Sequence, residues 1–170
     1  MFKIGDTISY KDMCVEENTG SLQRGMNYRL GGTYSVVLMS ERVKAPYTDR
    51  VDEIDQMLIY EGHDVSKTAD NPTPKLVDQP RTSLTGKLTQ NGLFFQAVEL
   101  EKENQREPEL VRVYEKIRKG IWTYNGLFQL VDAWLEETST NSDRSNVRNV
   151  FKFKLELLEE ENADSSPTQD

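Results

Sequence analysis

The sequence predicts a mainly β member of the α+β class: a curved, twisted β-barrel of about six to eight strands with a few short helices. Three observations support this prediction. Short apolar or alternating runs recur along the 170 residues, turn-forming residues separate many of them, and stretches with helical periodicity are scarce. The chain is 36% hydrophobic and 29% charged, a composition typical of a globular domain that buries one core.

Several runs are predicted to form strands from their composition and period. Residues 34–39 (YSVVLM) and 56–60 (QMLIY) are continuous apolar runs of the length typical of buried strands. Residues 92–100 (GLFFQAVEL) combine aromatic and aliphatic side chains, which also favours a strand. Residues 110–117 (LVRVYEKI) alternate apolar with polar side chains, which indicates a strand with one exposed face.

The later part of the chain extends this pattern. Residues 121–134 are predicted to form two strands around a tight turn at Asn125-Gly126, because Asn-Gly is the strongest short-range hairpin signal. Residues 147–158 alternate again and complete the predicted set of strands. Short strands at this spacing favour a barrel or a curved sheet.

Helices and long connections account for the remaining sequence. Residues 6–17 are predicted to form one helix, and residues 83–92 a shorter one that an Asn-Gly pair would end. Residues 18–33 and 61–82 lack apolar periodicity. Structureless segments of this length are uncommon in compact domains unless they are functional or disordered, so we single both out. Residues 101–109 form a charged connector.

The chain has one cysteine, Cys14, and one histidine, His63, and these numbers exclude several kinds of site. One cysteine cannot form an internal disulfide and fits the cytoplasm, which is the location we expect. One cysteine with one histidine cannot complete a zinc site of the Cys/His type. His63 has no second histidine, nucleophile or metal set beside it, so we expect no catalysis, no metal and no cofactor in this chain. The sequence also contains neither a secretory signal nor a membrane-spanning run.

The charge is unevenly distributed. The net charge of −8 argues at first sight against a polyanionic partner. Residues 156–170, however, carry six acidic residues and no basic one, so the rest of the chain has a net charge of −2. Residues 111–154 hold eight Lys or Arg against five Asp or Glu, which allows a basic face. We predict one domain at 1–158 and an acidic polar linker at 159–170.

The order of several segments resembles the SET- and RING-associated (SRA) domain, also called the YDG domain. The segments are GGTYSVVLMS, PYTDRVDE, LIYEGHD, DQPRTSLTGKLTQNG, LVRVYEK, TYNGLFQLVDAW and VRNVFKFKL, in that order. Tyr124-Asn125-Gly126 stands where the family has its Tyr-Asp-Gly signature, with Asn in place of Asp. The resemblance extends over about residues 20–158 and rests on the order and spacing of the pieces together.

This resemblance implies a curved barrel that reads modified cytosine in double-stranded DNA. The family flips 5-methylcytosine out of the duplex, holds it between two aromatic rings and reads its edge with a carboxylate, while two loops enter the grooves. Bacterial members are fused to nuclease domains, often of the HNH type, that restrict modified DNA. The resemblance thus implies a non-catalytic reader of 5-methylcytosine or 5-hydroxymethylcytosine in the bacterial cytoplasm. A homodimer formed through a nuclease domain outside this chain is a further expectation.

On this resemblance, Tyr47 and Tyr60 are the expected walls of a base pocket. Asp49 is the first choice for the carboxylate, because the edge of cytosine presents an amino donor that a carboxylate accepts. The alternative to a base pocket is that both tyrosines are structural aromatics and that Asp49 caps its own turn.

The pocket departs from the family at two positions. The family's reading carboxylate lies three residues after the first tyrosine, where this chain has Arg50, so Asp49 or Asp52 must substitute. Glu61 stands where many members have a threonine that contacts the base. A carboxylate there favours a hydroxymethylated or larger modified cytosine.

The two long segments are the expected DNA-entering loops. Gln23, Arg24 and Met26 lie near the tip of the first, where an amide or apolar side chain can wedge into the gap left by a flipped base. Lys67 and Lys75 belong to the second loop. The alternative for the first loop is a flexible glycine-rich segment with solvated arginines, and the alternative for the second is a disordered connector. Other basic side chains are candidate phosphate contacts or solvated charges: Arg81, Lys87, Arg112, Lys116, Arg118 and Lys119.

Two other readings stay open at this stage. One is a related barrel that binds RNA or another modified nucleic acid, which predicts a preference for single strands. The other is an interaction domain for a small molecule or a protein. A steep dependence of DNA binding on salt would argue against this last reading.

Overall fold

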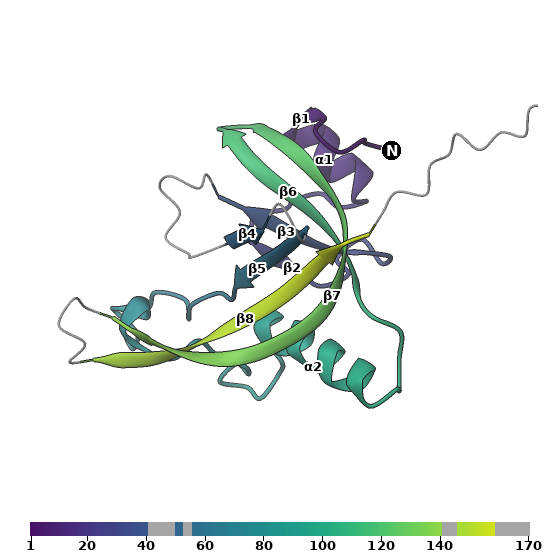
Figure 1. Cartoon of the computed structure of the whole chain (residues 1–170). Coiled ribbons are helices and arrows are strands. Elements are labelled where there is room, and N and C mark those ends of the chain that lie inside the picture. The colour runs from purple at the N-terminus through teal and green to yellow at the C-terminus, as the bar shows by residue number, and fades with distance from the viewer. Residues whose placement is uncertain (41–49, 53–55, 141–145, 159–170) are drawn as a thin grey trace, which may run out of the picture.

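The computed structural model describes residues 1–40, 50–52, 56–140 and 146–158. Its strands join into one eight-stranded sheet that curls into part of a barrel (Figure 1). The strands are β1 (Thr7–Ser9), β2 (Met26–Asn27), β3 (Ser35–Met39), β4 (Arg50–Asp52), β5 (Met57–Glu61), β6 (Leu110–Arg118), β7 (Ile121–Ser139) and β8 (Val147–Leu157). The helices are α1 (Tyr10–Glu16), α2 (Gln90–Lys102) and a single 3₁₀ turn, η1 (Pro74–Leu76). The predicted fold class is confirmed.

The strand order is β2-β3-β6-β7-β8-β5-β4, with β1 pairing separately with β7. The β3–β6 pair is parallel and the other pairs are antiparallel. The long strand β7 produces the curl, because it pairs with β1 and β6 near its start and with β8 toward its end. Register shifts between Val113 and Tyr114 on β6, and between Leu130 and Asp132 on β7, add local bending.

The strands predicted from apolar runs and alternation at 34–39, 56–60, 110–117 and 147–158 are confirmed as β3, β5, β6 and β8. The strand predicted at 92–100 is wrong, because these residues belong to α2. The Thr89 hydroxyl accepts a hydrogen bond from Gly92 N at 3.2 Å and so caps the helix. The Asn-Gly pair therefore begins this helix, whereas the sequence predicted that it ends one.

The helical periodicity of α2 was hidden inside a nearly continuous apolar run. Phe94, Ala97 and Val98 are all buried, and their spacing of three and four residues places them on one face. Phe94 packs edge-on against Phe153 of β8, with ring centroids 5.9 Å apart. Burial against the sheet therefore decides between helix and strand here.

The hairpin predicted at Asn125-Gly126 is also wrong. Both residues lie inside β7, where Tyr124 pairs with Tyr114 and Gly126 with Val113, which leaves Asn125 as the extra residue of a β-bulge. Gly126 has φ +118°, a conformation that suits glycine. The turn between β6 and β7 instead lies at Gly120, whose φ is +77°.

The helix predicted at 6–17 is shorter than expected. Residues 7–9 form β1, and Ser9 caps α1 by accepting a hydrogen bond from Asp12 N at 3.1 Å. Residues 7–9 are extended and do not join the helix, because β1 pairs with β7.

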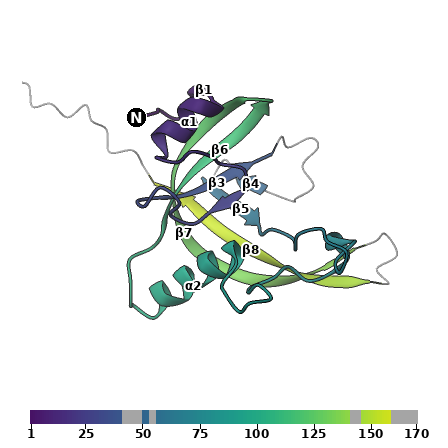
Figure 2. The same ribbon diagram turned by 180° about the vertical axis from the view of Figure 1, so that it is seen from behind.

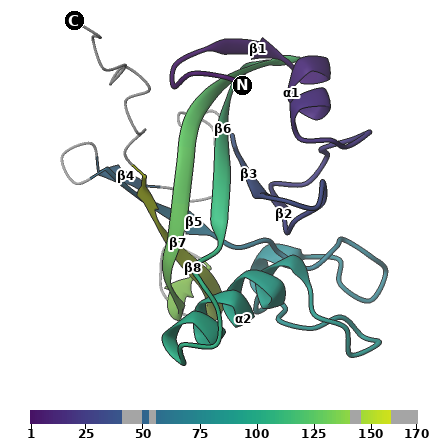
Figure 3. The same cartoon turned by 90° about the vertical axis from the view of Figure 1, so that its right-hand side faces the viewer.

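Two clusters form the core. The larger lies between the sheet and α2 and includes Phe94, Phe153 and Leu130; the smaller lies under α1 and includes Met13 and Tyr114. Figures 1 and 2 show α1 and β1 at one end of the molecule and α2, with the connection from β5, at the other. Figure 3 shows that this connection and the segment around β2 lie on the same side of the sheet. Among the described helices, none is long and apolar enough to cross a membrane.

Candidate nucleic-acid interface

Tyr60 lies near the end of β5 with its side chain directed into the larger core cluster. It is 5% exposed, and its hydroxyl donates a hydrogen bond to the carbonyl oxygen of Leu38 at 3.3 Å. The hydroxyl also lies against Gly25, where an added Cβ would come within 2.5 Å of it. The expected pocket wall is therefore in direct contact with the expected DNA-entering loop.

Glu61 points away from the ring of its neighbour, because consecutive strand residues face opposite sides of a sheet. Its carboxylate accepts a hydrogen bond from Lys152 Nζ at 3.1 Å, and both residues are buried. Lys152 also lies 3.7 Å from a carboxylate oxygen of Glu136. Glu61 and Tyr60 therefore do not line one surface, and the expectation that both line one base pocket needs correction.

Two other predicted pocket residues, Tyr47 and Asp49, lie outside the described residues. The backbone of Asp52 belongs to β4, where it pairs with Met57 of β5. Arg50 pairs in the same way with Ile59. Strand pairing thus places the backbone of Arg50–Asp52 alongside β5.

The first predicted DNA-entering loop contains β2. Met26 is 2% exposed and packs in the core, so the expectation that it projects from a loop tip is wrong. It pairs with Val37 of β3, and this pairing turns its side chain inward. Gln23 and Arg24, by contrast, are exposed.

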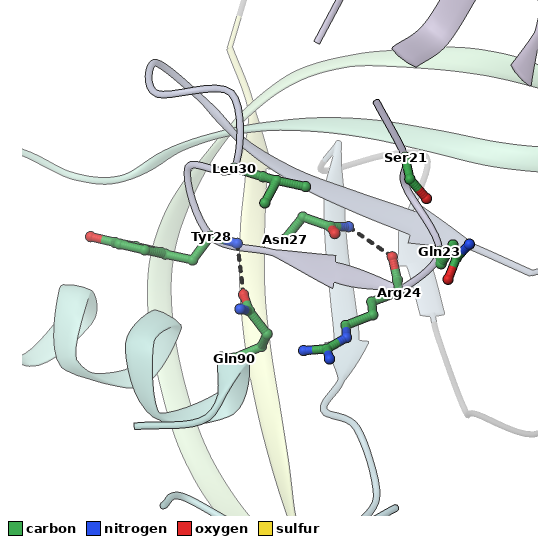
Figure 4. A pocket seen from close by; sticks show the side chains of 7 residues that line it. All are labelled: Ser21, Gln23, Arg24, Asn27, Tyr28, Leu30 and Gln90. Carbon is green, nitrogen blue, oxygen red and sulfur yellow. Dashed lines mark hydrogen bonds between the residues drawn. The ribbon is translucent and has the colours of Figure 1, made fainter. Parts of the chain in front are cut away.

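Arg24 and Gln23 line an open pocket of about 230 Å³ between this loop and the first turn of α2 (Figure 4). The side chain of Asn27 donates to the carbonyl oxygen of Arg24 at 2.7 Å, and Tyr28 N donates to Gln90 Oε1 at 2.7 Å. The first bond holds the loop to itself, and the second ties the loop to the helix. The lining residues are Ser21, Gln23, Arg24, Asn27, Tyr28, Leu30 and Gln90.

A buried carboxylate, Glu109, holds the base of the same loop. It is 1% exposed and accepts hydrogen bonds from Arg29 at 2.8–3.1 Å, from Ser35 at 2.9 Å and from Arg106. Burial alone would raise the pKa of Glu109, but these donors outweigh it and hold the pKa below its usual value. Arg106 also donates to the hydroxyl of Tyr28 at 2.9 Å.

The second predicted loop is anchored to β8. Asp64 accepts from Arg148 at 2.7 Å, Lys75 at 3.0 Å and Gln79 at 3.2 Å. Burial raises the pKa of Asp64, and these hydrogen bonds bring it below its usual value. Lys75, an expected DNA contact, is thus paired with Asp64 but remains about half exposed, while Lys67 is exposed.

His63 joins this segment to α2. Its Nδ1 lies 2.9 Å from the carbonyl oxygen of Asp64, so Nδ1 carries the proton, and its Nε2 accepts from Asn91 N at 3.3 Å. Burial lowers the pKa of His63, and the charge of Arg24 lowers it further, although the Asp64 carbonyl opposes this. Both ring nitrogens therefore have partners within the fold, and His63 ties the connection after β5 to α2.

No sequence pattern predicted that Glu109, Arg148 and Gln90 organise the two loops. Each is a single polar residue, and its partners are distant in the chain. No local pattern marks such residues. In the described ranges, no group of three or more His, Cys, Asp or Glu side chains could hold a metal ion.

The candidate phosphate contacts do not form one face. Arg112 is 9% exposed, bonds Glu16 and Glu17 at 3.3 and 3.2 Å and stacks on Tyr34, so its assignment as a phosphate contact is wrong. Burial raises the pKa of Glu17, although the hydrogen bond from Tyr114 opposes this.

The other basic candidates fall into two groups. Arg81 and Lys87 precede α2. The Arg81 side chain donates to Glu99 and lies over the ring of Phe95. The carbonyl oxygen of Lys87 accepts a hydrogen bond from Ser83 N at 2.7 Å and so closes a tight turn. The remaining three lie near the β6–β7 turn, at the opposite end of the molecule (Figures 1 and 2): Lys116, Arg118 and Lys119.

The fold is that of known DNA-binding domains. The chain is similar to the SUVH5 SRA domain bound to fully hydroxymethylated CG DNA, with a TM-score of 0.60 and 23% identity over 92% of this chain and 89% of that one. It is similar to the modification-dependent TagI restriction endonuclease, with a TM-score of 0.56 and 18% identity over 92% of this chain and 50% of that one. A third similar structure holds the sulfur-binding and SRA domains of ScoMcrA with phosphorothioated DNA, with a TM-score of 0.55 and 18% identity over 93% and 40% of the two chains.

At these identities, the solved structures show the fold alone. A comparison with curated proteins gives no match. A protein-family model, described as SAD/SRA domain, matches residues 2–161, which is nearly the whole chain. This domain is a DNA-binding reader and not a catalytic unit. The chain therefore belongs to the SAD/SRA domain family.

Proposed function

We propose that this protein reads modified cytosine in double-stranded DNA by flipping the base into a pocket. The family match over residues 2–161 is the observation that carries the proposal. It is supported by the similarity in fold to SRA domains solved with methylated and with hydroxymethylated DNA.

Tyr60 and Tyr47 are the proposed walls of this pocket. Extruding a base costs a few kcal/mol, and stacking on aromatic side chains returns about 1–3 kcal/mol per base, so two rings would about balance the cost. Asp49 or Asp52 would accept the hydrogen bond from the amino group of cytosine. In this proposal the identity of the carboxylate, and not that of the aromatic walls, decides whether cytosine is recognised.

Tyr60 is only 5% exposed, so a base reaches its ring only if neighbouring residues move. The loop containing Gln23 and Arg24 is the candidate, because its Gly25 lies against the Tyr60 hydroxyl. The loop would then enter the duplex and uncover the Tyr60 ring in one coupled movement.

We further propose that the domain is the recognition module of a modification-dependent restriction endonuclease. The similarity in fold to the modification-dependent endonucleases TagI and AspBHI supports this assignment. The chain spans about half of TagI and 64% of AspBHI, so cleavage would belong to a separate nuclease domain. An HNH nuclease, dimerisation through it and a bacterial cytoplasmic location complete the proposal.

The test is competition binding at about 100 mM salt, where phosphate contacts still contribute to affinity. Four matched duplexes would carry one cytosine, 5-methylcytosine, 5-hydroxymethylcytosine or glucosylated cytosine, and a single strand and an RNA would serve as further competitors. We expect a clear preference for at least one modified duplex. Equal, weak binding to all four duplexes would refute base reading. Tighter binding to the single strand or the RNA would favour an RNA-binding barrel.

A further inference from the structure

We propose that the pocket between Arg24 and Gln90 is a subsite for one phosphodiester group of the bound DNA. This inference rests on the proposed function and adds a specific contact to it. The pocket is the open space shown in Figure 4, into which the side chains of Arg24 and Gln90 both project.

The lining of the pocket suits an anion. Arg24 supplies the cation and Gln90, Gln23 and Ser21 supply neutral donors, whereas no Asp or Glu is among the described residues that line the pocket. Within the part of the chain that the structure describes, Arg24 has no ion-pair partner, unlike Arg29 in the same loop, which is held by Glu109. A guanidinium that no carboxylate neutralises, next to amide donors, is suited to a phosphate oxygen.

The donors are held in place before any ligand arrives. Gln90 Oε1 accepts from Tyr28 N, and this bond orients the side-chain amide so that its NH₂ group is left to donate. Tyr28 is held in turn by Arg106 through its hydroxyl. The backbone of Arg24 is fixed by the side chain of Asn27. Such preorganisation reduces the entropy lost on binding.

The size and lining of the pocket suit a phosphate better than a flipped base. The pocket is open, and its volume of about 230 Å³ lies below the roughly 300–1,000 Å³ of pockets that enclose whole small molecules. A phosphate with a few water molecules fits this space, and the described lining has a single aromatic residue, Tyr28, where a flipped base would stack between two rings. The pocket is therefore a backbone contact, separate from the proposed base pocket.

The position of the pocket places this phosphate close to the flipped nucleotide. Arg24 is near enough to His63 for its charge to lower the pKa of that imidazole. His63 follows β5 by two residues, and β5 carries Tyr60. Arg24 is also adjacent in sequence to Gly25, which touches the Tyr60 hydroxyl. A phosphate held here would fix the backbone beside the base that Tyr60 receives.

Gln90→Glu is the sharpest test, because it keeps the acceptor for Tyr28 N and places a negative charge in the pocket. Gln96→Glu is the matched control, since Gln96 is exposed on the same helix and the change in net charge is identical. We expect Gln90→Glu to weaken binding of modified and plain duplexes alike by about tenfold, as the loss of a charge-assisted contact predicts, and Gln96→Glu by less than about threefold. Thermal unfolding would verify that both variants fold.

Arg24→Gln provides a second measurement that does not depend on the helix. Removing one phosphate contact should reduce the slope of log affinity against log salt by about 0.9. A duplex in which one phosphate is replaced by a neutral methylphosphonate should bind wild type more weakly. On this methylphosphonate duplex, Gln90→Glu and wild type should have nearly equal affinities.

The outcomes separate this inference from the proposed function. If wild type prefers modified DNA but Gln90→Glu behaves like Gln96→Glu, the subsite is wrong and the reader stands. An unchanged salt slope in Arg24→Gln would overturn the subsite in the same way. If wild type binds all four duplexes equally while Gln90→Glu is tenfold weaker, the subsite stands and base reading fails. If wild type binds no DNA, both proposals fail.

Discussion

The contact between Gly25 and Tyr60 can be tested by a pair of substitutions that should compensate for one another. An alanine Cβ at position 25 would lie 2.5 Å from the Tyr60 hydroxyl oxygen, well inside the normal contact distance. The next nearest atoms, the Leu38 carbonyl oxygen at 3.5 Å and Tyr60 Cζ at 3.8 Å, are at ordinary distances. The backbone of Gly25 is not in the left-handed region, so alanine itself is allowed there. The hydroxyl is therefore the one group that opposes the substitution.

The expected magnitudes follow from this geometry. Gly25→Ala should destabilise the fold by about 1–3 kcal/mol, the usual cost of overpacking. Tyr60→Phe removes a hydroxyl that donates to the Leu38 carbonyl, at a cost of about 1 kcal/mol. In the double variant the clash is absent, so its loss of stability should be close to that of Tyr60→Phe alone. The coupling free energy of the cycle is then about 1–2 kcal/mol, in the compensating direction.

Urea unfolding of wild type, both single variants and the double variant measures this coupling. Tryptophan fluorescence is a suitable signal, because Trp122 and Trp134 both lie in β7. Equal m-values would show that the four proteins unfold between comparable states. If the losses in the double variant are simply additive, the hydroxyl does not obstruct position 25, and the proposed link between the loop and the pocket wall is refuted.

Three further predictions concern the pocket, the loop anchor and pH. Asp49→Ala should abolish discrimination between modified and plain cytosine in the competition assay, whereas Lys75→Ala should weaken both alike; retained discrimination would move the reading role to another carboxylate. Glu109→Ala should lower the free energy of unfolding by about 3 kcal/mol in urea, because two arginines and Ser35 lose a buried partner, and a loss below about 1 kcal/mol would contradict this. The lowered pKa of His63 predicts stability that is present above about pH 6.5 and lost as the pH falls through the folded-state pKa, because protonation of Nε2 opposes the bond from Asn91 N. Unfolding at pH 7 and pH 5 should therefore show a larger loss in wild type than in His63→Gln, and equal losses would refute the assignment.

Local composition and the length of apolar runs identified several of the buried strands. Residues 34–39 and 110–117 became β3 and β6, which are buried at every position and at four consecutive positions, respectively, because apolar runs of this length suit strands covered on both faces. The family resemblance followed from the order of such segments, and the family match supports it. Composition likewise excluded a zinc site of the Cys/His type and an internal disulfide, since these require more cysteines or histidines than the chain has.

Long-range contacts decided the elements that local signals misassigned. Asn125-Gly126 fits a hairpin turn as well as a bulge, and the pairing of the residues on either side of Asn125 with β6 selects the bulge. Residues 92–100 suit a strand by composition, but the Thr89 cap and burial against the sheet make them helical. A window of a few residues carries no information about either partner.

The sequence by itself determined four of the sheet-forming segments, their order along the chain and the chemistry available to the chain. Only the tertiary structure decided that Met26 and Arg112 are buried, that Glu61 pairs with Lys152 and that Arg24 faces Gln90 across an open pocket. The physical reason is that exposure and charge pairing depend on residues distant in sequence: Arg24 and Gln90 are 66 positions apart and meet only because β2 packs beside α2. Side-chain type sets what a residue can bind, and folding sets what it meets.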